Sequence, residues 1–164
     1  MGPAEATFAD VQKLIVFFLK AWEEAGPGAF GFTGATQETI NEIASEEFLK
    51  ERLSKRDVKM YFVEDGGNIL GLAVTRKIDE NAIELSGIIV LEASTRKGIG
   101  TELFEKVISS AKHDGFGKIV VKTEVLNQRA IGFYKKKGLS EVGKTRENVE
   151  GRPVDLVVLE RCLR

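Results

Sequence analysis

The chain has 164 residues, of which 43% are apolar, and its 24 Lys and Arg residues nearly balance 25 Asp and Glu residues, which gives a formal net charge of -1. This length suits one compact domain, and the balanced charge argues against a protein whose main task is to grip nucleic acid or anionic lipid. One cysteine, Cys162, and one histidine, His113, are too few for a disulfide framework or a Cys/His zinc site.

The first predicted element is an amphipathic helix over residues 7–25, in which apolar residues recur every three or four positions. Its apolar stripe consists of Val11, Leu14, Ile15, Phe18 and Trp22. The longest apolar run, residues 14–19, is six residues long, against roughly 20 needed to span a bilayer. We therefore expect no transmembrane helix and no membrane partner. Because no basic segment resembling a signal peptide opens the chain, we expect a cytoplasmic protein.

Residues 26–34 contain four glycines and one proline, which predicts a flexible loop. Helical periodicity over residues 36–55, with Ser45 able to cap a second piece, predicts one broken helix or two short ones. Two strands joined by a turn at Gly66-Gly67 follow, and after a second turn at residues 79–81 comes a nearly apolar strand over residues 83–91. These strands predict an antiparallel meander.

An alternation of helix (98–113), strand (119–125) and helix (128–137) comes next. A strand, a helix and a second strand in succession imply a right-handed crossover and hence one parallel strand pair. Residues 141–148 and 154–163 are predicted to form a closing hairpin.

The strongest local signal is the segment at residues 90–101, where a buried strand leads through a short basic turn into a helix. Gly98 and Gly100 lack Cβ atoms, so a ligand can approach the backbone closely. The unsatisfied amides of the first helical turn attract anions, and Arg96 and Lys97 add positive charge. The plainer alternative is that the glycines only form a tight turn. The phosphate motifs of nucleoside triphosphate and dinucleotide sites are not present.

A second segment, Asn-Gln-Arg-Ala-Ile-Gly-Phe-Tyr-Lys-Lys-Lys-Gly-Leu at residues 127–139, follows the glycine turn. Together the two segments resemble the motifs of the GNAT superfamily of acetyl-CoA-dependent N-acetyltransferases, Gln/Arg-x-x-Gly-x-Gly/Ala and Asn-x-x-Ala-x-x-Phe-Tyr-x-x-x-Gly-Phe. The resemblance covers residues 60–162. Thr95 stands where the family has Gln or Arg, and Leu139 replaces an aromatic residue.

The resemblance implies an α/β (α+β) fold: a mixed, mostly antiparallel twisted sheet with one splayed parallel strand pair and flanking helices. Residues 1–164 would form a single N-acetyltransferase domain whose first strand is short or absent, because only about six residues precede the first helix.

The resemblance also implies acetyl-CoA as cosubstrate, no metal, and direct acetyl transfer to an amine of a small molecule or protein. A homodimer is compatible with the sequence, and nucleic acid is not an expected partner. The coenzyme-binding residues implied by the motifs are Ile88, Ile89, Val90, Thr95, Arg96, Lys97, Gly98, Ile99, Gly100, Thr101, Asn127, Ala130, Phe133 and Tyr134.

Three groups are candidates for catalysis. The resemblance implies that the Val90 N–H stabilises the oxyanion and that Tyr134 protonates the departing thiolate; the alternative is that Tyr134 belongs only to the core. Glu84 lies six residues before Val90, and even spacing predicts that both share one strand face. A carboxylate in an apolar strand is costly unless partnered, which makes Glu84 a functional candidate. The resemblance implies a base acting through water at this position, and the alternative is an exposed residue at the strand end.

Two rival interpretations remain open from the sequence. One is a non-catalytic module that binds or senses acyl-CoA, and the other is a different nucleotide-phosphate binder that uses the same helix terminus. The sequence does not specify the acceptor amine, since the segments that would shape its pocket resemble the family least.

Overall fold

The computed structural model describes residues 2–26, 36–149 and 151–164. Their strands form one sheet in the order β1-β2-β3-β4-β5-β7-β6. The strands are β1 (Ala4–Glu5), β2 (Val58–Asp65), β3 (Asn68–Lys77), β4 (Ala82–Val90), β5 (Lys118–Glu124), β6 (Ser140–Val149) and β7 (Arg152–Cys162). The β4–β5 pair is parallel and the other neighbouring pairs are antiparallel. The predicted mixed sheet, with its meander, crossover and closing hairpin, is confirmed.

The helices begin and end close to where the sequence predicts. They are α1 (Val11–Ala25), preceded by the 3-10 turn η1 (Phe8–Asp10), α2 (Gln37–Ile43), α3 (Glu46–Ser54), α4 (Ile99–His113), preceded by the 3-10 turn η3 (Glu92–Ser94), and α5 (Gln128–Lys136). The Phe48 N–H donates to Ser45 Oγ at 3.2 Å, which confirms the predicted second cap. The loop predicted at residues 26–34 lies, from residue 27 onward, outside the described residues.

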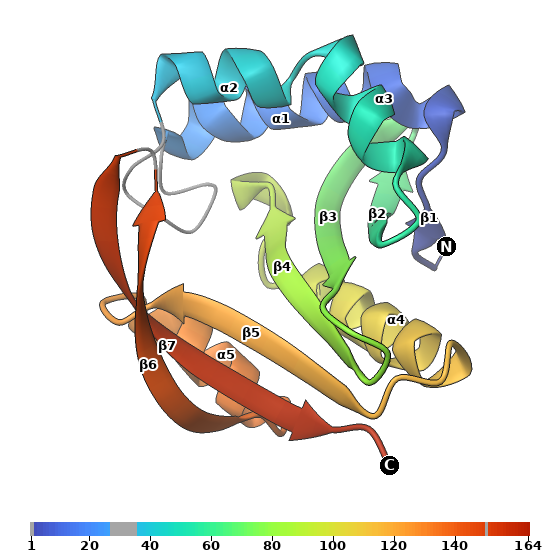
Figure 1. Cartoon of the computed structure of the whole chain (residues 1–164). Coiled ribbons are helices and arrows are strands. Elements are labelled where there is room, and N and C mark those ends of the chain that lie inside the picture. Colours follow the sequence, from blue (N-terminus) through green and yellow to red (C-terminus); the bar gives the residue numbers. More distant parts are fainter. Residues whose placement is uncertain (1, 27–35, 150) are drawn as a thin grey trace.

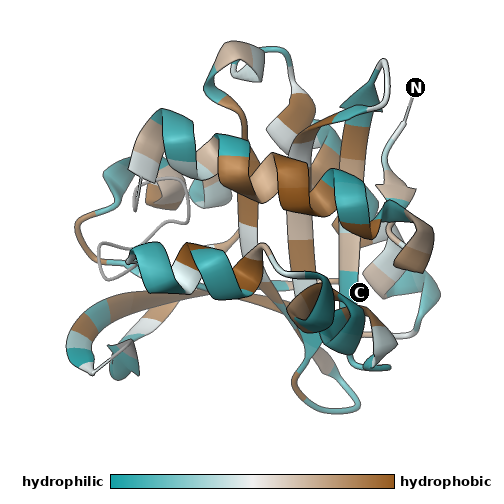
Figure 2. Ribbon diagram, turned by 90° about the horizontal axis from the view of Figure 1, so that it is seen from above, coloured by the Kyte–Doolittle hydropathy of each residue, from teal (hydrophilic) through white to brown (hydrophobic). Residues whose placement is uncertain are grey.

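Helices cover both faces of the sheet (Figure 1), and a hydrophobic core lies beneath the helices on each face. One core joins α1, α2 and α3 to one face of β2 and β3, and the other joins α4 and α5 to the opposite face. In Figure 2 hydrophilic and hydrophobic residues alternate along the helices seen from above, as expected of amphipathic helices that cover a sheet. Phe17 and Ala21 of α1 are buried although they lie outside the predicted stripe, because α1 is covered both by the sheet and by its neighbouring helices.

A β-bulge changes the direction of the side chains along β4. Leu85 pairs with Thr75 of β3, but the next β3 residue, Val74, pairs with Gly87, so Ser86 is an extra residue in β4. A bulge of this kind breaks the strict alternation of side chains along a strand. Ile88 accordingly packs in the core beneath α4, and Ile89 packs in the core beneath α1.

The parallel pair is short. Pairing between β4 and β5 covers only Ala82 to Glu84 on β4 and Lys118 to Val120 on β5. Beyond Glu84 the two strands diverge toward their carboxyl ends (Figure 1). The splayed pair expected from the sequence is therefore present, and among the described strands none pairs with this edge of the second half of β4.

Candidate active site

A cleft of about 1130 Å³ opens where β4 and β5 diverge. Its walls come from the end of β4, the turn before α4, the first turn of α4, the exposed face of α5 and the last turn of α1. All the predicted coenzyme-binding residues except Lys97 line it. These are Ile88, Ile89, Val90, Thr95, Arg96, Gly98, Ile99, Gly100, Thr101, Asn127, Ala130, Phe133 and Tyr134. Two segments that are about 30 residues apart in the sequence thus meet across one hollow.

The amide of Val90 points into this cleft. The Leu91 N–H donates to the Leu70 carbonyl oxygen of β3 at 2.9 Å. Successive N–H groups along a strand point to opposite edges, so the Val90 N–H points away from β3, toward the side from which β5 has diverged. An amide held in this way is a preorganised donor for a carbonyl oxygen that gains negative charge.

The turn before α4 presents backbone N–H groups at the cleft. Arg96 and Gly98 have positive φ angles of 66° and 79°, and such turns curl successive amides around a concave anion site. Gly98 caps α4, and within the described residues no side chain caps the amides of the first turn by a hydrogen bond. The Thr95 hydroxyl donates to the Glu92 carbonyl at 2.8 Å, which stabilises the turn from within.

Because Gly100 has no side chain, the cleft stays open beside the first turn of α4. A Cβ built on Gly100 would lie 3.8 Å from the Phe133 ring, which is ordinary van der Waals contact. Nothing in the fold therefore demands glycine here, and its effect is to leave open the part of the cleft beside the helix terminus. Gly71 is different, because a Cβ there would lie 2.7 Å from Ile99 Cγ2. Gly71 lets the first turn of α4 pack closely against β3.

Helix α5 supplies the opposite wall. Asn127 caps it, since the Ala130 N–H donates to Asn127 Oδ1 at 3.2 Å. Tyr134 is 6% exposed and packs edge-on against Phe133, with ring centroids 5.3 Å apart. Burial raises the pKa of the Tyr134 hydroxyl to about 12, so the phenol stays protonated at neutral pH and keeps a proton to donate.

Glu84 lies away from this cleft. Its carboxylate accepts a hydrogen bond from Arg76 at 3.1 Å, and its second oxygen lies 3.9 Å from Lys122 Nζ. Lys122 in turn pairs with Glu147 at 2.8 Å. The prediction that Glu84 and Val90 share a strand face is wrong, because the bulge at Ser86 shifts the alternation by one residue between them.

Several cleft residues were not predicted from the sequence. They are Ala21, Glu24 and Ala25 of α1, Glu92 and Ser94 of the turn, and Arg129 of α5. Arg129 lies inside the second motif, so its position two residues after the helix cap was a usable signal. The α1 residues carry no such signal, since only the packing of α1 brings them to the end of β4. There the Glu92 N–H donates to Glu24 Oε2 at 3.0 Å.

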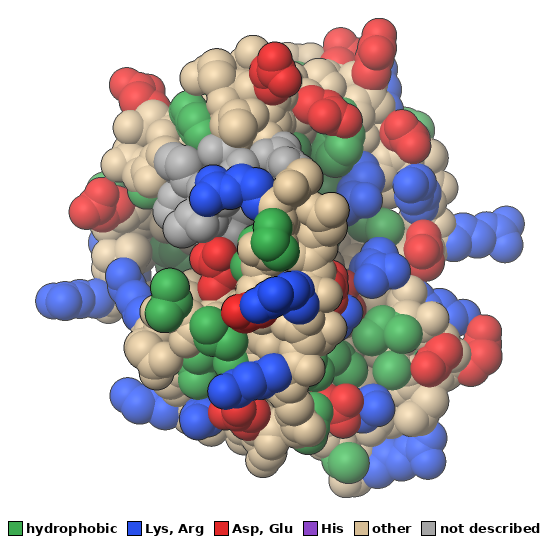
Figure 3. Space-filling view, turned by 60° about the vertical axis from the view of Figure 1, so that its left-hand side comes forward, with side chains coloured by type: hydrophobic (Ala, Val, Ile, Leu, Met, Phe, Trp, Pro, Cys, Tyr) green, Lys and Arg blue, Asp and Glu red, His purple; other side chains and the backbone are tan. Residues whose placement is uncertain are grey.

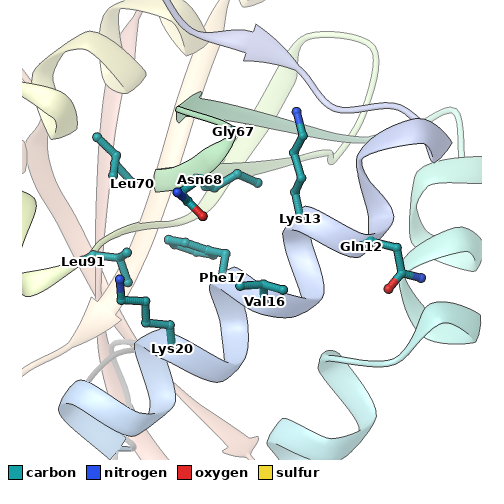
Figure 4. A pocket seen from close by; sticks show the side chains of 10 residues that line it. Gln12, Lys13, Val16, Phe17, Lys20, Gly67, Asn68, Leu70 and Leu91 are labelled. Carbon is teal, nitrogen blue, oxygen red and sulfur yellow. The ribbon is translucent and has the colours of Figure 1, made fainter. Parts of the chain in front are cut away.

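A second hollow, of about 240 Å³, lies between α1 and the β2–β3 turn. Figure 4 shows Phe17 reaching from α1 toward Leu91, with Lys13 and Lys20 on either side of it. Lys13 is already paired with Glu64 at 2.9 Å. None of the residues predicted to act in binding or catalysis lines this hollow.

Charge elsewhere on the described surface is mixed. On the face shown in Figure 3, Lys and Arg side chains are interspersed with Asp and Glu side chains. The described residues contain no group of three or more His, Cys, Asp or Glu side chains arranged to hold a metal ion. None of the helices in the described part of the chain combines the length and apolar character needed to cross a bilayer.

Comparisons with known proteins agree with this geometry. The family model described as "Acetyltransferase (GNAT) family" matches residues 20–139. A probable N-acetyltransferase of Drosophila melanogaster, named san, is 42% identical over 72 residues, which are 42% of this chain and 39% of that protein. N-alpha-acetyltransferase 50 of Danio rerio is 38% identical over 72 residues, 42% of each chain. The chain thus spans about two fifths of the length of these relatives.

Solved structures share the fold. A protein of Streptococcus mutans superposes with a TM-score of 0.78 at 19% identity and full coverage of both chains. The ribosomal-protein-S18-alanine N-acetyltransferase of Escherichia coli superposes with a TM-score of 0.70 at 16% identity, covering 98% of this chain and 92% of that chain. At these identities the likeness concerns the fold alone.

Proposed function

The chain belongs to the acetyltransferase (GNAT) family, and we propose that it is an acyltransferase that transfers the acetyl group of acetyl-CoA directly to a primary amine. The observation that carries this proposal is the cleft at the open edge of β4, where the Val90 N–H, the first turn of α4 and Tyr134 line one hollow. The N-acetyltransferase names of the curated relatives support an amine acceptor.

The residues of the cleft suit acetyl-CoA. The uncapped amides of the first α4 turn, together with Arg96 and Arg129, suit its pyrophosphate. Gly98 and Gly100 leave the backbone accessible at that point. The free edge of β4 at Ile88 and Val90 offers backbone groups to the amides of the pantetheine arm, as an added strand would use them. Acetyl-CoA supplies the activated acyl group as a thioester.

The chain's own groups then serve three needs of the reaction. The amine must lose one proton before its lone pair can attack the thioester carbon. As the C–N bond forms, the Val90 N–H donates to the carbonyl oxygen, which gains negative charge. As the C–S bond breaks, the Tyr134 hydroxyl gives its proton to the departing sulfur, and the phenolate recovers a proton from the acylated nitrogen.

Tyr134 suits the acid role because of its environment. Tyr134 lies on the cleft side of α5 and is 6% exposed, and its hydroxyl makes no hydrogen bond within the described residues. Burial raises its pKa to about 12, so the hydroxyl is still protonated when the C–S bond breaks and the thiolate forms beside it. The assignment of Glu84 as the proton-accepting base stays a prediction, which activity measurements must test.

The test has two parts. Acetyl-CoA should raise the melting temperature of the protein, whereas ATP and NAD at the same concentration should not. Coenzyme A release should then depend on an amine from a panel of lysine, polyamine, amino acid and peptide amines. Binding of acetyl-CoA with no release from any amine would support a non-catalytic acyl-CoA module instead, and stabilisation by ATP or NAD alone would support a nucleotide binder.

A further inference from the structure

We propose that Glu24, at the end of α1, accepts the proton of the incoming amine and selects acceptors that carry a positive charge. This inference rests on the proposed function above and assigns within it a residue that neither the motifs nor the spacing in the sequence indicate. It is carried by the carboxylate's place in the cleft and by its hydrogen bond to Glu92.

The first argument is position. The Glu92 N–H donates to Glu24 Oε2 at 3.0 Å, and Glu92 lies two residues after Val90. Two extended residues span about 7 Å, so this hydrogen bond holds the carboxylate at the end of β4, in the same cleft as the Val90 N–H. The hydrogen bond engages one carboxylate oxygen. Within the described residues, no hydrogen bond or ion pair engages Oε1.

The second argument is space. Ala21 and Ala25 lie three residues before and one residue after Glu24, and both also line the cleft. Their small side chains leave room around the carboxylate at the end of α1. Glu24 itself is exposed, so a proton that it accepts can pass to solvent.

The third argument is charge. The carboxyl end of a helix carries a partial negative charge, and α1 ends at Ala25, immediately after Glu24. The helix terminus and the carboxylate therefore favour a cation at the same place. An alkylammonium group with a pKa of about 10.4 is charged at neutral pH, so this site attracts the amine in the form that predominates in solution.

Glu84 compares poorly with Glu24 for this task. Arg76 and Lys122 both lie against the Glu84 carboxylate, and Glu84 does not line the cleft. Five residues of β4, including the bulge, separate Glu84 from Val90, whereas a single residue separates Val90 from Glu92, whose N–H holds the Glu24 carboxylate. The proton step assigned to Glu24 is simple: an N–H bond of the ammonium breaks, the electron pair stays on nitrogen, and the carboxylate takes the proton directly or through one water.

The experiment compares kcat/KM against pH for the parent, Glu24→Gln, Glu24→Ala and Glu23→Gln, with the best amine of the panel. Glutamine keeps an oxygen that can accept the Glu92 N–H but has no charge, and alanine lacks both. Glu23 is exposed and does not line the cleft, so it is the matched control. Acetyl-CoA affinity, measured by titration, reports on the coenzyme side of the cleft.

We expect Glu24→Gln to lower kcat/KM by about 10- to 10³-fold at pH 7, with acetyl-CoA affinity within about twofold of the parent. The deficit should shrink as pH rises toward the pKa of the amine, because free amine then needs no base. Glu23→Gln should match the parent. Should Glu24→Ala fold poorly, Glu24→Gln alone decides the question.

Superimposable pH profiles of the parent and Glu24→Gln would overturn the assignment. A larger, pH-dependent loss in Glu84→Gln or Glu92→Gln than in Glu24→Gln would also overturn it and would move the role to that residue. A parent that binds acetyl-CoA but acetylates no amine would overturn the proposed function and this inference together, so the two failures are distinguishable.

Discussion

The two ends of β4 differ in what their backbone edges contact. At Ala82 to Glu84 the strand has neighbours on both sides, and the one carboxylate there is held by Arg76 and Lys122. At Ile88 to Val90 the strand pairs, within the described part of the chain, with β3 alone, and the other edge faces the cleft. Backbone groups in a complete sheet are already bonded to other strands. At the open end of β4, backbone groups remain available to bind a ligand, and for this reason we propose that the reaction takes place there.

The largest expected effect is on turnover and concerns Tyr134 of α5, the helix that forms the wall of the cleft opposite the open end of β4. Tyr134→Phe keeps the packing of the ring and removes only the hydroxyl, so turnover should fall by roughly 10²- to 10⁴-fold while acetyl-CoA affinity stays nearly unchanged. Tyr61→Phe is the matched control, since Tyr61 is also buried but its hydroxyl bonds Ser110, away from the cleft. Equal turnover in Tyr134→Phe and the parent would leave Tyr134 with a packing role only.

The next largest effect concerns the helix terminus beside the open end. Gly100→Glu places bulk and negative charge at the amides of the first α4 turn, so acetyl-CoA affinity should fall by roughly 100-fold or more. Gly100→Ala is the control, because its Cβ makes only ordinary contact with Phe133; it should remain folded and keep most of the affinity. Thermal-shift titration with acetyl-CoA measures both variants. A folded Gly100→Glu protein with parental affinity would contradict the assigned pyrophosphate site.

Alkaline pH provides a third test. Burial raises the pKa of Tyr134 to about 12, so below pH 10 the phenol is neutral in both the folded and unfolded states. Between pH 10 and 12 the unfolded phenol ionises first, and the parent should lose about 1.4 kcal/mol of stability per pH unit from this group. The unfolding free energies of the parent and Tyr134→Phe, measured with denaturant over this pH range, should diverge by this amount. Parallel pH curves would mean that the phenol ionises as easily in the folded protein as in the unfolded chain.

A smaller effect, on the free energy of unfolding, is expected where Gly71 of β3 packs closely against α4. Gly71→Ala should cost about 1–3 kcal/mol of stability, because its Cβ would lie 2.7 Å from Ile99 Cγ2 in the first turn of α4. Acetyl-CoA binding should weaken as that turn shifts. Gly87→Ala is a suitable control on β4, since a Cβ there meets nothing within 4 Å. Equal unfolding free energies for the two variants would show that α4 adjusts without cost.

The smallest effects on stability and kcat/KM are expected at Glu84, at the end of β4 that pairs with both β3 and β5. Glu84→Gln removes a charge flanked by two cations whose side chains are partly exposed, so we expect stability to fall by no more than about 1 kcal/mol and kcat/KM to change by less than about threefold. The informative measurement is kcat/KM against pH. A loss that is greatest at low pH and fades as pH rises would restore Glu84 as the base.

Local sequence patterns determined most elements of this fold. Helical periodicity, the cap at Ser45, the glycine turns and the alternation of helix and strand after Glu92 each depend on residues close together in the chain, and the structure confirms them. The two motifs also indicated 13 residues that line one cleft. A helix terminus presents its amides whatever side chains surround it, so this turn could be recognised from the sequence, and the binding role of the 13 residues stays a prediction.

Only the tertiary structure decided how the faces and partners of these elements combine. The bulge at Ser86 places Glu84 and Val90 on opposite faces of β4 and not on the expected same face. A single extra residue shifts the two-residue alternation of side chains by one, and this extra residue arises in the pairing of β4 with β3. The approach of Glu24 to Glu92 joins residues 68 positions apart. Such contacts depend on how α1 packs on the sheet, and no periodicity within either segment encodes them.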